Sequence, residues 1–593
     1  MMLPLSAAYF SNLPYTLRQP NGDTFDCLIT GDEYYHYLHD ADGFTIVKNP
    51  QTGYYVYAVK ENGQVVPSPY VAGKVSPRSV GLVSGVRISA AEWQARRSAM
   101  TAVARRSGPV VRDNHGELNN LVVFIRFADD EEFDQSPVQL NNMFNSLEDL
   151  SLKKYYNIAS YNQLDIESHL LPPPSETTVF SYQDSHPRSY YCKWAEDNPM
   201  GYGEDDPDNE SYPRTEREMA LITNAIDFVR NYIPDNLDID HDNDDVVDNI
   251  CFVVKGGVED WSDLLWPHMW CLYTDEVYIN GKRVWNFNFQ LSDNSSYFTV
   301  SVLCHEMFHT LGAPDLYHYS DTVGYAPVGP WDLMAQNGNP PQHSGVYMKY
   351  KYGGWIDAIP EITESGTYTL FPVSSGTPEG IGYRIASEVD NEFFVLEFRR
   401  KLGTLENSLP GTGLLVYRIN AEFNGNAGWN GEDVLDEVYI YRPNGTLTED
   451  GQVNKAHFTQ RQGRTELSYA TNPKPFLSNG YVSGIRIYDV NVDNDTLTFK
   501  YLRPGDVLST EEFEAMQLSV SPNPVRDVLQ VEISFDPVLV QEAALYDLTG
   551  RKVAEMSLGT QHTLPVSDYA KGTYIFTVTL VDGKKISQKV VVQ

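Results

Sequence analysis

The fold of the central part of this chain is decided by the stretch Ser301-Val302-Leu303-Cys304-His305-Glu306-Met307-Phe308-His309-Thr310-Leu311-Gly312-Ala313-Pro314-Asp315. On an α-helix, His305 and His309 lie one turn apart on the same face, so both imidazoles can bind one zinc ion. Glu306 lies beside them and is the expected general base toward a zinc-bound water. Gly312 suits the left-handed residue that ends a helix, after which the chain turns back and brings Asp315 to the metal as a third ligand. Because Asp after Pro is also a good turn former, a purely local role for Asp315 is the alternative.

Apolar patterns upstream of this stretch predict an α/β domain. Leu121–Phe127 and Ile250–Val254 are continuous apolar runs, which are typical of buried strands. Between them, Thr215–Glu218 matches a capping box, and apolar residues follow at spacings of three and four on one helical face: Met219, Ile222, Ile226, Val229 and Ile233. Two strands and two helices in this order predict an α/β core within residues 109–358.

Short β-type runs and turn signals dominate the rest of the sequence, so we expect a multidomain α+β protein. Residues 9–72 predict a small β-rich domain. Residues 90–108, with the pairs Arg96-Arg97 and Arg105-Arg106, predict an exposed, cleavable linker, although a surface helix fits equally well. Residues 361–502 carry no helical pattern and predict a β-sandwich, and the end of the chain predicts an Ig-like β-sandwich. The expected domains are 1–108, 109–358, 359–503 and 517–593.

The composition excludes several classes of function. The 593 residues hold 80 Asp and Glu against 44 Lys and Arg, and the resulting net charge of −36 repels nucleic acids and anionic lipids. No run reaches the ~18–20 apolar residues that a membrane-spanning helix needs. Five cysteines without a CxxC pair define no disulfide framework. Met1–Ala8 is similar to the end of a secretory signal, which predicts export; an ordinary N-terminus is the alternative.

A second candidate metal site is the acidic stretch just before Ile250–Val254. Carboxylates recur at every second position and can turn their oxygens to a common centre, as in DxDxD calcium loops; the candidate ligands are Asp240, Asp242, Asp244 and Asp248. Asp245 stands where such loops usually carry Gly, and the distal Glu of these loops is absent. We predict a calcium ion here, and a solvated acidic turn without metal is the alternative.

Four segments carry a resemblance to a known family: Gly312–Tyr317, Gly329–Met334, Lys154–Tyr161 and Trp266–His268. They resemble the immune inhibitor A family of secreted bacterial metallopeptidases. The resemblance implies a metzincin-like catalytic domain that hydrolyses peptide bonds in proteins or peptides, with Met334 in the Met-turn beneath the zinc. Where many members carry Gly directly before the second zinc-binding His, this chain has Phe308, which should not disturb ligation.

The substrate contacts of such a site are less well defined by the sequence. We predict that Trp285–Phe289 is an edge strand that aligns substrate by β-augmentation. The donor that stabilises the tetrahedral intermediate stays open among four tyrosines: Tyr319, Tyr325, Tyr347 and Tyr350. His268, His318 and His343 receive no role, because a lone His is more often a packing residue.

Gly31–His36 resembles the pro-segment that precedes the catalytic domain in the same family. The resemblance implies that residues 1–108 hold a pro-domain and that the chain is made as a zymogen. In that state Asp32, or alternatively Cys27, would occupy the open zinc position. We expect an Arg-directed protease to activate the chain by cleavage between Arg97 and Asn119.

The C-terminal motifs Ser519–Pro524, Leu545–Arg551, Gly572–Tyr574 and Lys584–Val592 resemble, in this order, the sorting domain of type IX secretion. The resemblance implies the type IX machinery as a partner, export through the periplasm, and a secreted or outer-surface location in a Gram-negative bacterium. We expect a monomer with zinc and calcium as cofactors. The alternative is a surface adhesin or glycan-binding protein with a degenerate metal site, against which the intact Glu306 argues.

Overall fold

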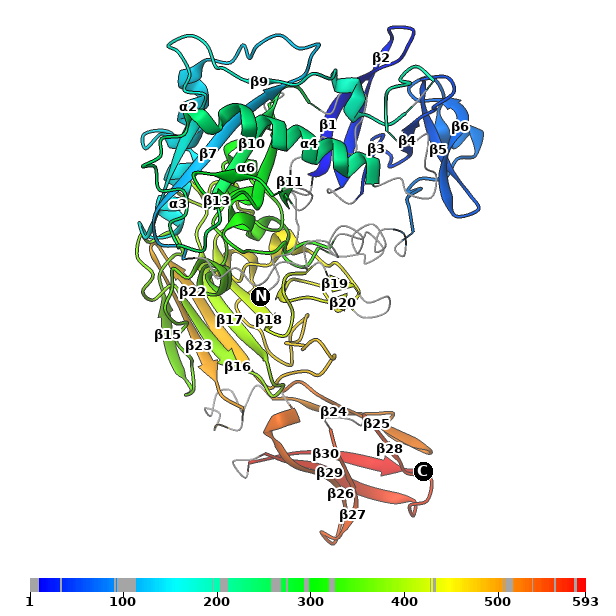
Figure 1. Ribbon diagram of the computed structural model, residues 1–593. Helices are drawn as coiled ribbons and strands as arrows, with labels where there is room; N and C mark the ends of the chain where they lie inside the picture. The colour runs from blue at the N-terminus through cyan, green and yellow to red at the C-terminus, as the bar shows by residue number, and fades with distance from the viewer. Residues whose placement is uncertain are drawn as a thin grey trace.

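The computed structural model describes most of the chain: residues 10–31, 35–89, 92, 113–194, 196–202, 212–257, 268–272, 276–292, 298–318, 326–426, 428–429, 434–504, 506, 516–535, 537–558, 562–580 and 584–593. Its strands fall into an N-terminal sheet, a central unit (residues 113–359), a middle β unit (361–504) and a C-terminal β unit (516–593), as Figure 1 shows. The expected multidomain α+β architecture is confirmed. The domain boundaries and the metzincin-like and Ig-like assignments stay predictions.

The N-terminal sheet is an antiparallel meander whose strands pair in sequence order: β1 (Phe10–Arg18), β2 (Thr24–Gly31), β3 (His36–His39), β4 (Thr45–Lys48), β5 (Tyr55–Glu61) and β6 (Gln64–Val71), followed by the 3₁₀ turn η1 (Pro77–Val80). Its buried side chains share one hydrophobic core with the central unit. At the contact, the Glu196 N–H donates to the Pro50 carbonyl at 3.0 Å, and Lys48 lies 3.3 Å from Asp197. The predicted latency residue Asp32 and both Arg pairs lie outside the described residues.

The central unit is built on one mixed sheet in the order β11-β14-β10-β7-β8. Its strands are β7 (Gly116–Arg126), β8 (Leu164–Leu171), β10 (Asn249–Val254), β11 (His268–Cys271) and β14 (Asn286–Leu291); β9 (Tyr182–Gln183) pairs with β7, and β12 (Tyr278–Ile279) with β13 (Lys282–Arg283). The two predicted strands are β7 and β10. All pairings in the sheet are parallel except β11 with β14, which is antiparallel.

The prediction that Trp285–Phe289 forms an edge strand is wrong. β14 lies between β10 and β11, and within the described residues β11 is the outer strand on that side. The large apolar side chains of Phe287 and Phe289, both buried, were the sequence signal for an inner strand. A strand that lies between two neighbours in a sheet covered on both faces is typically rich in apolar residues.

The helices of the central unit are α2 (Pro137–Asn145), α3 (Leu152–Ala159), α4 (Tyr212–Val229), α6 (Val300–Thr310) and α7 (Val346–Met348), with the short turns η2 (Arg188–Tyr191), η3 (Arg230–Tyr232) and η4 (Gly329–Trp331) and the π-turn η5 (Lys349–Gly353). α4 is the predicted amphipathic helix, but both ends differ from the prediction. It begins at Tyr212, so Thr215 lies inside the first turn rather than at the cap; Pro213 favours this earlier start. It ends at Val229, and Ile233, which precedes a proline, is extended.

The middle β unit consists of two sheets. One has the order β15-β23-β22, and the other β16-β17-β18-β21. The bounds are β15 (Gly366–Leu370), β16 (Gly382–Ala386), β17 (Glu392–Arg399), β18 (Gly413–Asn420), β21 (Val438–Ile440), β22 (Arg486–Asp493) and β23 (Thr496–Leu502), with the small pair β19 (Gly428–Trp429) and β20 (Val434–Leu435) and the turns η6 (Val453–Lys455) and η7 (Gln460–Gln462). No α-helix occurs among its described residues, as expected.

The four-stranded sheet of the middle β unit is buried on both faces. Along β17 and β18, Phe394 and Val416 pack toward the three-stranded sheet, whereas Val395 and Tyr417 belong to the core of the central unit. This follows from the alternation of side chains along a strand. The sheet is therefore a layer shared by two units, and one hydrophobic core continues from the central unit into it.

The shared face also carries fully buried charges. Arg399 donates to the carboxylate of Glu406 at 2.7 and 2.9 Å and to the Trp331 carbonyl at 2.6 Å. Glu397 accepts from the Tyr417 hydroxyl at 2.6 Å and from the Val346 N–H at 2.7 Å. Buried charges are tolerated when they are paired and hydrogen-bonded in this way, and these bonds join the two units.

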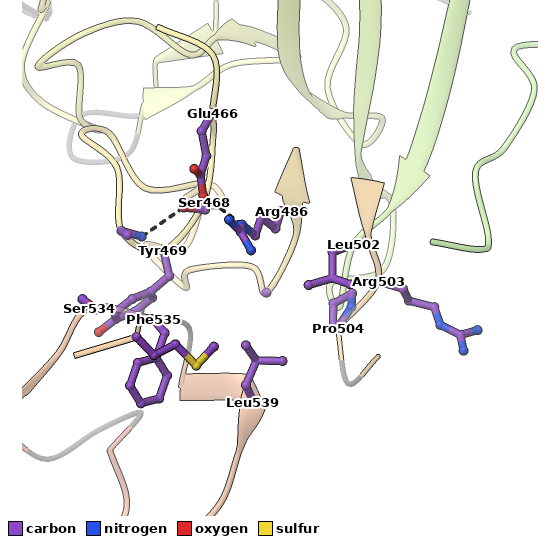
Figure 2. Close-up of a pocket in the computed structure, with 13 residues that line it drawn as sticks. Glu466, Ser468, Tyr469, Arg486, Leu502, Arg503, Pro504, Ser534, Phe535 and Leu539 are labelled. Atoms are coloured by element: carbon purple, nitrogen blue, oxygen red, sulfur yellow. Dashed lines mark hydrogen bonds and ion pairs between the residues drawn. The ribbon is translucent and has the colours of Figure 1, made fainter. Parts of the chain in front are cut away.

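The C-terminal β unit holds a three-stranded sheet, β24-β25-β28, and a four-stranded sheet, β27-β26-β29-β30, around one core. Its elements are β24 (Leu518–Ser521), β25 (Val528–Ile533), β26 (Val540–Asp547), β27 (Lys552–Met556), β28 (Thr563–Pro565), β29 (Gly572–Leu580), β30 (Lys585–Val592) and η8 (Pro537–Leu539). A pocket of about 100 Å³ lies between this unit and the middle β unit. Figure 2 shows residues that line it, among them Tyr469, Leu502 and Phe535. The pocket is small for a ligand site, which usually takes roughly 300–1,000 Å³. Among the described residues, no helix is long and apolar enough to cross a membrane.

Candidate metal centre

Three of the predicted ligands meet at one point in the central unit. The Nε2 atoms of His305 and His309 lie 2.9 Å apart, and each lies close to Oδ1 of Asp315, at 3.2 and 3.3 Å. All three side chains are at most 1% exposed. The helix supplies the two histidines, and the loop that follows it supplies the aspartate.

The backbone fixes the orientation of both imidazole rings. Nδ1 of His305 lies 3.0 Å from the Leu333 carbonyl, and Nδ1 of His309 lies 2.8 Å from the Ala313 carbonyl. Because a carbonyl oxygen can only accept, each Nδ1 must carry a proton and donate it. The Nε2 atoms of both rings therefore face the common point, which is the arrangement that metal-binding histidines show.

The geometry and the charge of the group fit a zinc ion. Tetrahedral ligands at about 2.0–2.1 Å from zinc lie about 3.3 Å from one another, close to the separations observed here. Burial lowers the pKa of His305, but the hydrogen bond and charge of Asp315 outweigh it and raise this pKa to about 9. Burial raises the pKa of Asp315, but the charges of His309 and His305 hold it below its usual range. The group therefore stabilises positive charge at the point where its ligand atoms converge.

The helix α6 places Glu306 next to this point. Thr299 caps the helix, since its hydroxyl accepts from the Val302 N–H at 3.3 Å, and the helix ends at Thr310. Gly312 has φ of +104°, as the predicted left-handed exit requires. Glu306 is fully buried, and its charge also acts on His305. A buried carboxylate beside three metal-ligand side chains is the position that a general base needs.

The segment around Met334 connects the two ligand-bearing segments. The carbonyl of Leu333 accepts from His305, and the carbonyl of Met334 accepts from the Leu316 N–H at 2.8 Å. Asp332 in turn accepts from the Met334 N–H at 2.8 Å. Met334 is fully buried in the hydrophobic core that also contains apolar side chains of α6. Its predicted role in a Met-turn stays a prediction, but its backbone positions the loop of Asp315.

A chain of buried amides, which the sequence analysis missed, holds the helix on the sheet. The hydroxyl of Thr310 donates toward Oδ1 of Asn249 and of Asn288, at 3.0 and 3.1 Å. Asn249 donates to Asn120 at 2.7 Å, and Asn120 donates to Ser168 at 2.9 Å. These side chains come from β8, β7, β10 and β14 in turn. The signal in the sequence was an Asn directly before each of the apolar runs Leu121–Phe127 and Ile250–Val254.

The acidic loop before β10 brings together three of its four predicted ligands. Carboxylate oxygens of Asp240, Asp242 and Asp244 lie within 4.8 Å of one another, whereas Asp248 accepts from the His241 N–H at 3.1 Å. The ammonium of Lys282 lies 2.6 Å from Asp240 and 2.9 Å from Asp245, and its positive charge offsets part of the acidic charge. Calcium binding has no further support here and stays a prediction.

The remaining candidates are the two predicted latency residues and the four tyrosines predicted as possible donors to the tetrahedral intermediate. Asp32, Tyr319 and Tyr325 lie outside the described residues. Tyr347 donates to Glu437 at 2.8 Å, and 40% of Tyr350 is exposed. The alternative latency residue Cys27 is buried in β2, and burial raises the pKa of its thiol to about 12, which disfavours the thiolate that binds metal.

The histidines without an assigned role also have partners. His268 on β11 lies 2.8 Å from Glu218 on α4, and His318 contacts Asp436 of the middle β unit. His343 contacts Lys349 at 3.2 Å within the buried charges between the units. These contacts account for their positions as packing residues.

Comparison with known proteins gives two family matches. Residues 130–346 match the model of the immune inhibitor A peptidase M6 catalytic domain, which covers both α6 and the loop of Asp315. Residues 519–593 match the model of a secretion system C-terminal sorting domain, which covers the C-terminal β unit. The first match indicates a peptidase, and the second indicates secretion or a cell-surface location in a Gram-negative bacterium of the Bacteroidetes type.

The other comparisons add little. No curated protein matches the chain. Among solved structures, catalytically inactive OgpA from Akkermansia muciniphila, in complex with an O-glycopeptide (glycodrosocin) substrate, aligns at 7% identity over 82% of this chain and 94% of its own, with a TM-score of 0.20. A TM-score this low supports no argument about fold or substrate. The family matches remain: the chain contains a segment that matches the catalytic domain of the immune inhibitor A peptidase family, followed by a segment that matches a C-terminal sorting domain of a secretion system.

Proposed function

We propose that the protein is a secreted or cell-surface zinc endopeptidase that hydrolyses peptide bonds of extracellular proteins and is made as a zymogen. The observation that carries the proposal is the buried group of His305, His309 and Asp315 with Glu306 beside it. This group lies in the part of the chain that matches the peptidase model. The adhesin alternative gains no support, because a structural metal site has no use for the Glu306 carboxylate.

The roles of the residues follow from their chemistry. His305 and His309, through Nε2, and the Asp315 carboxylate would hold the zinc ion, which would supply a Lewis acid that lowers the pKa of the attacking water. Glu306 takes a proton from the attacking water onto its carboxylate. It then delivers that proton to the leaving amine nitrogen, so that the carboxylate ends in its starting state. Burial of all four side chains keeps other water away from them.

The substrate strand is best placed at β11, in place of the strand predicted from the sequence. β11 is the outer strand of the central sheet within the described residues and runs antiparallel to β14, the neighbour that precedes α6 in the chain. An extended peptide can add to such a strand through backbone hydrogen bonds.

Latency and export complete the proposal. The N-terminal sheet packs on the central unit through a shared core, as an inhibitory pro-domain would. Asp32 remains the proposed residue at the open zinc position. The C-terminal β unit would direct the chain to the type IX machinery.

The test compares Glu306→Gln with Glu392→Gln, a matched control at a buried glutamate of the middle β unit. Both proteins are treated with an Arg-directed protease, and casein hydrolysis and zinc content are measured with and without a chelator. Glu306→Gln should keep its zinc and lose activity by roughly 10²–10⁴, since general-base removal costs that much. Activity within about tenfold of the parent, or activity that survives the chelator, would refute the proposed function.

A further inference from the structure

We propose that Asn426, a residue of the middle β unit, positions the third zinc ligand Asp315 and so sets the zinc affinity of the catalytic domain. The inference rests on the proposed function. It extends that function to a part of the chain beyond residues 130–346, which match the peptidase model.

Asn426 contacts the ligand loop, Gly312–His318, through both its backbone and its side chain. Its backbone N–H donates to the carbonyl of Asp315 at 3.0 Å. Its side-chain Nδ2 donates to the carbonyl of Leu316, the next residue, at 3.0 Å. Two consecutive carbonyls of the ligand loop are therefore held by one residue that is far away in the sequence.

The side chain of Asn426 is itself fixed by the middle β unit. Its Nδ2 also donates to the carbonyl of Val438 at 2.7 Å, and its Oδ1 accepts from the Val438 N–H at 2.9 Å. Asn426 is fully buried, and Val438 begins β21 in the sheet that both units share. The amide therefore works as a rigid bridge between β21 and the ligand loop, since its hydrogen-bonding groups are used on both sides.

The residue before Asn426 shows how closely the two segments approach. Gly425 has φ of +80°, and a Cβ atom on it would lie 2.7 Å from the Asp315 carbonyl oxygen and 2.7 Å from Cβ of Pro314. No larger residue fits there without moving the ligand loop. A second contact, between His318 and Asp436, ties the end of the same loop to the middle β unit.

The third ligand is the one that needs such support. His305 and His309 are held by helix α6, and their rings by backbone carbonyls. Asp315 lies in a loop outside any helix or strand, and on the side of the central unit the bond from Leu316 to Met334 anchors it. Residues that orient metal ligands in this way typically change metal affinity about 10–100-fold when they are removed.

The experiment measures zinc affinity of the full chain by competition with a chromogenic chelator. The variants are Asn426→Ala and Asn426→Asp. The Asp variant keeps the size of the side chain and the acceptor for the Val438 N–H but places an oxygen opposite the carbonyls of Leu316 and Val438. The control is Tyr441→Phe, which removes a buried hydrogen bond to Phe476 in the same unit without touching the ligand loop. Visible absorption of the cobalt-substituted proteins reports the coordination geometry directly.

Both Asn426 variants should bind zinc about 10–100-fold more weakly and show an altered cobalt spectrum, while Tyr441→Phe binds zinc as the parent does. If Asn426→Ala does not fold, the isosteric Asn426→Asp decides. If the Asn426 variants bind zinc as tightly as the parent does, the inference is overturned and the proposed function stays intact. The same holds if Tyr441→Phe loses as much zinc affinity as the Asn426 variants do. If the parent chain binds no zinc at His305 and His309, both fall together.

Discussion

The hydroxyl of Thr310 offers a direct test of how helix α6 is attached to the sheet. It has one proton and lies within hydrogen-bond distance of two buried amide oxygens, those of Asn249 and Asn288. Thr310→Val keeps the shape of the side chain but leaves at least one of these oxygens without a donor. An unsatisfied buried acceptor costs about 1–3 kcal/mol, so we expect a loss of about 2 kcal/mol in the free energy of unfolding.

The assay is thermal unfolding in the presence of a chelator, so that metal binding does not add to the measured stability. A loss of about 2 kcal/mol should lower the melting temperature of the catalytic part by roughly 4–8 °C. The control is Thr310→Ser, which keeps the donor and loses one buried methyl group, worth about 1 kcal/mol. The reasoning is refuted if Thr310→Val is as stable as Thr310→Ser or more stable.

Three further predictions concern metal, latency and pH. A calcium-selective chelator should lower the melting temperature, and replacing both Asp242 and Asp244 by Ala should abolish this response; an unchanged melting curve in the parent would leave the loop a plain acidic turn. The full chain should digest casein far more slowly than its product after limited trypsin treatment near Arg97 and Arg106, and equal rates would exclude a zymogen. Burial, together with the charge of Arg399, lowers the pKa of Lys349 from 10.5 to about 7. Between these two pH values the unfolded chain binds one more proton than the folded chain, so the free energy of unfolding rises with pH. In Lys349→Met, urea unfolding at a series of pH values should show this rise reduced by up to about 1.4 kcal/mol per pH unit, and an unchanged slope would contradict the assignment.

Local sequence patterns were sufficient for the part of the site that lies on one helix. His305, Glu306 and His309 are set by helical spacing, and Gly312 by the backbone conformation of a helix end, so their placement follows from residues that are close in sequence. Asp315 could be predicted because it lies only six positions after His309. The two strands β7 and β10 could be predicted from their continuous apolar composition.

The features that the sequence did not reveal depend on contacts between distant segments. The position of β14 inside the sheet is set by its pairing with β11, and a single strand pattern does not show which strands are its neighbours. The amide chain from Ser168 to Thr310 includes hydrogen-bonded residues that are up to 129 positions apart, each of which looks like an ordinary turn or cap residue. Asn426 is one of many Asn residues in a turn-rich region, and only the fold brings it to Asp315.

The four-stranded sheet with two buried faces limits how the protein can change during evolution. A substitution at Val395 or Tyr417 alters the packing beneath the peptidase, whereas one at the neighbouring Phe394 or Val416 alters only the interior of the middle β unit. Alternate residues of the same strand are therefore under different selection, and the units on its two sides cannot be exchanged between proteins as independent modules. Relatives that keep the metal ligands should also keep a compatible partner sheet, and the inward positions of the two units should vary together.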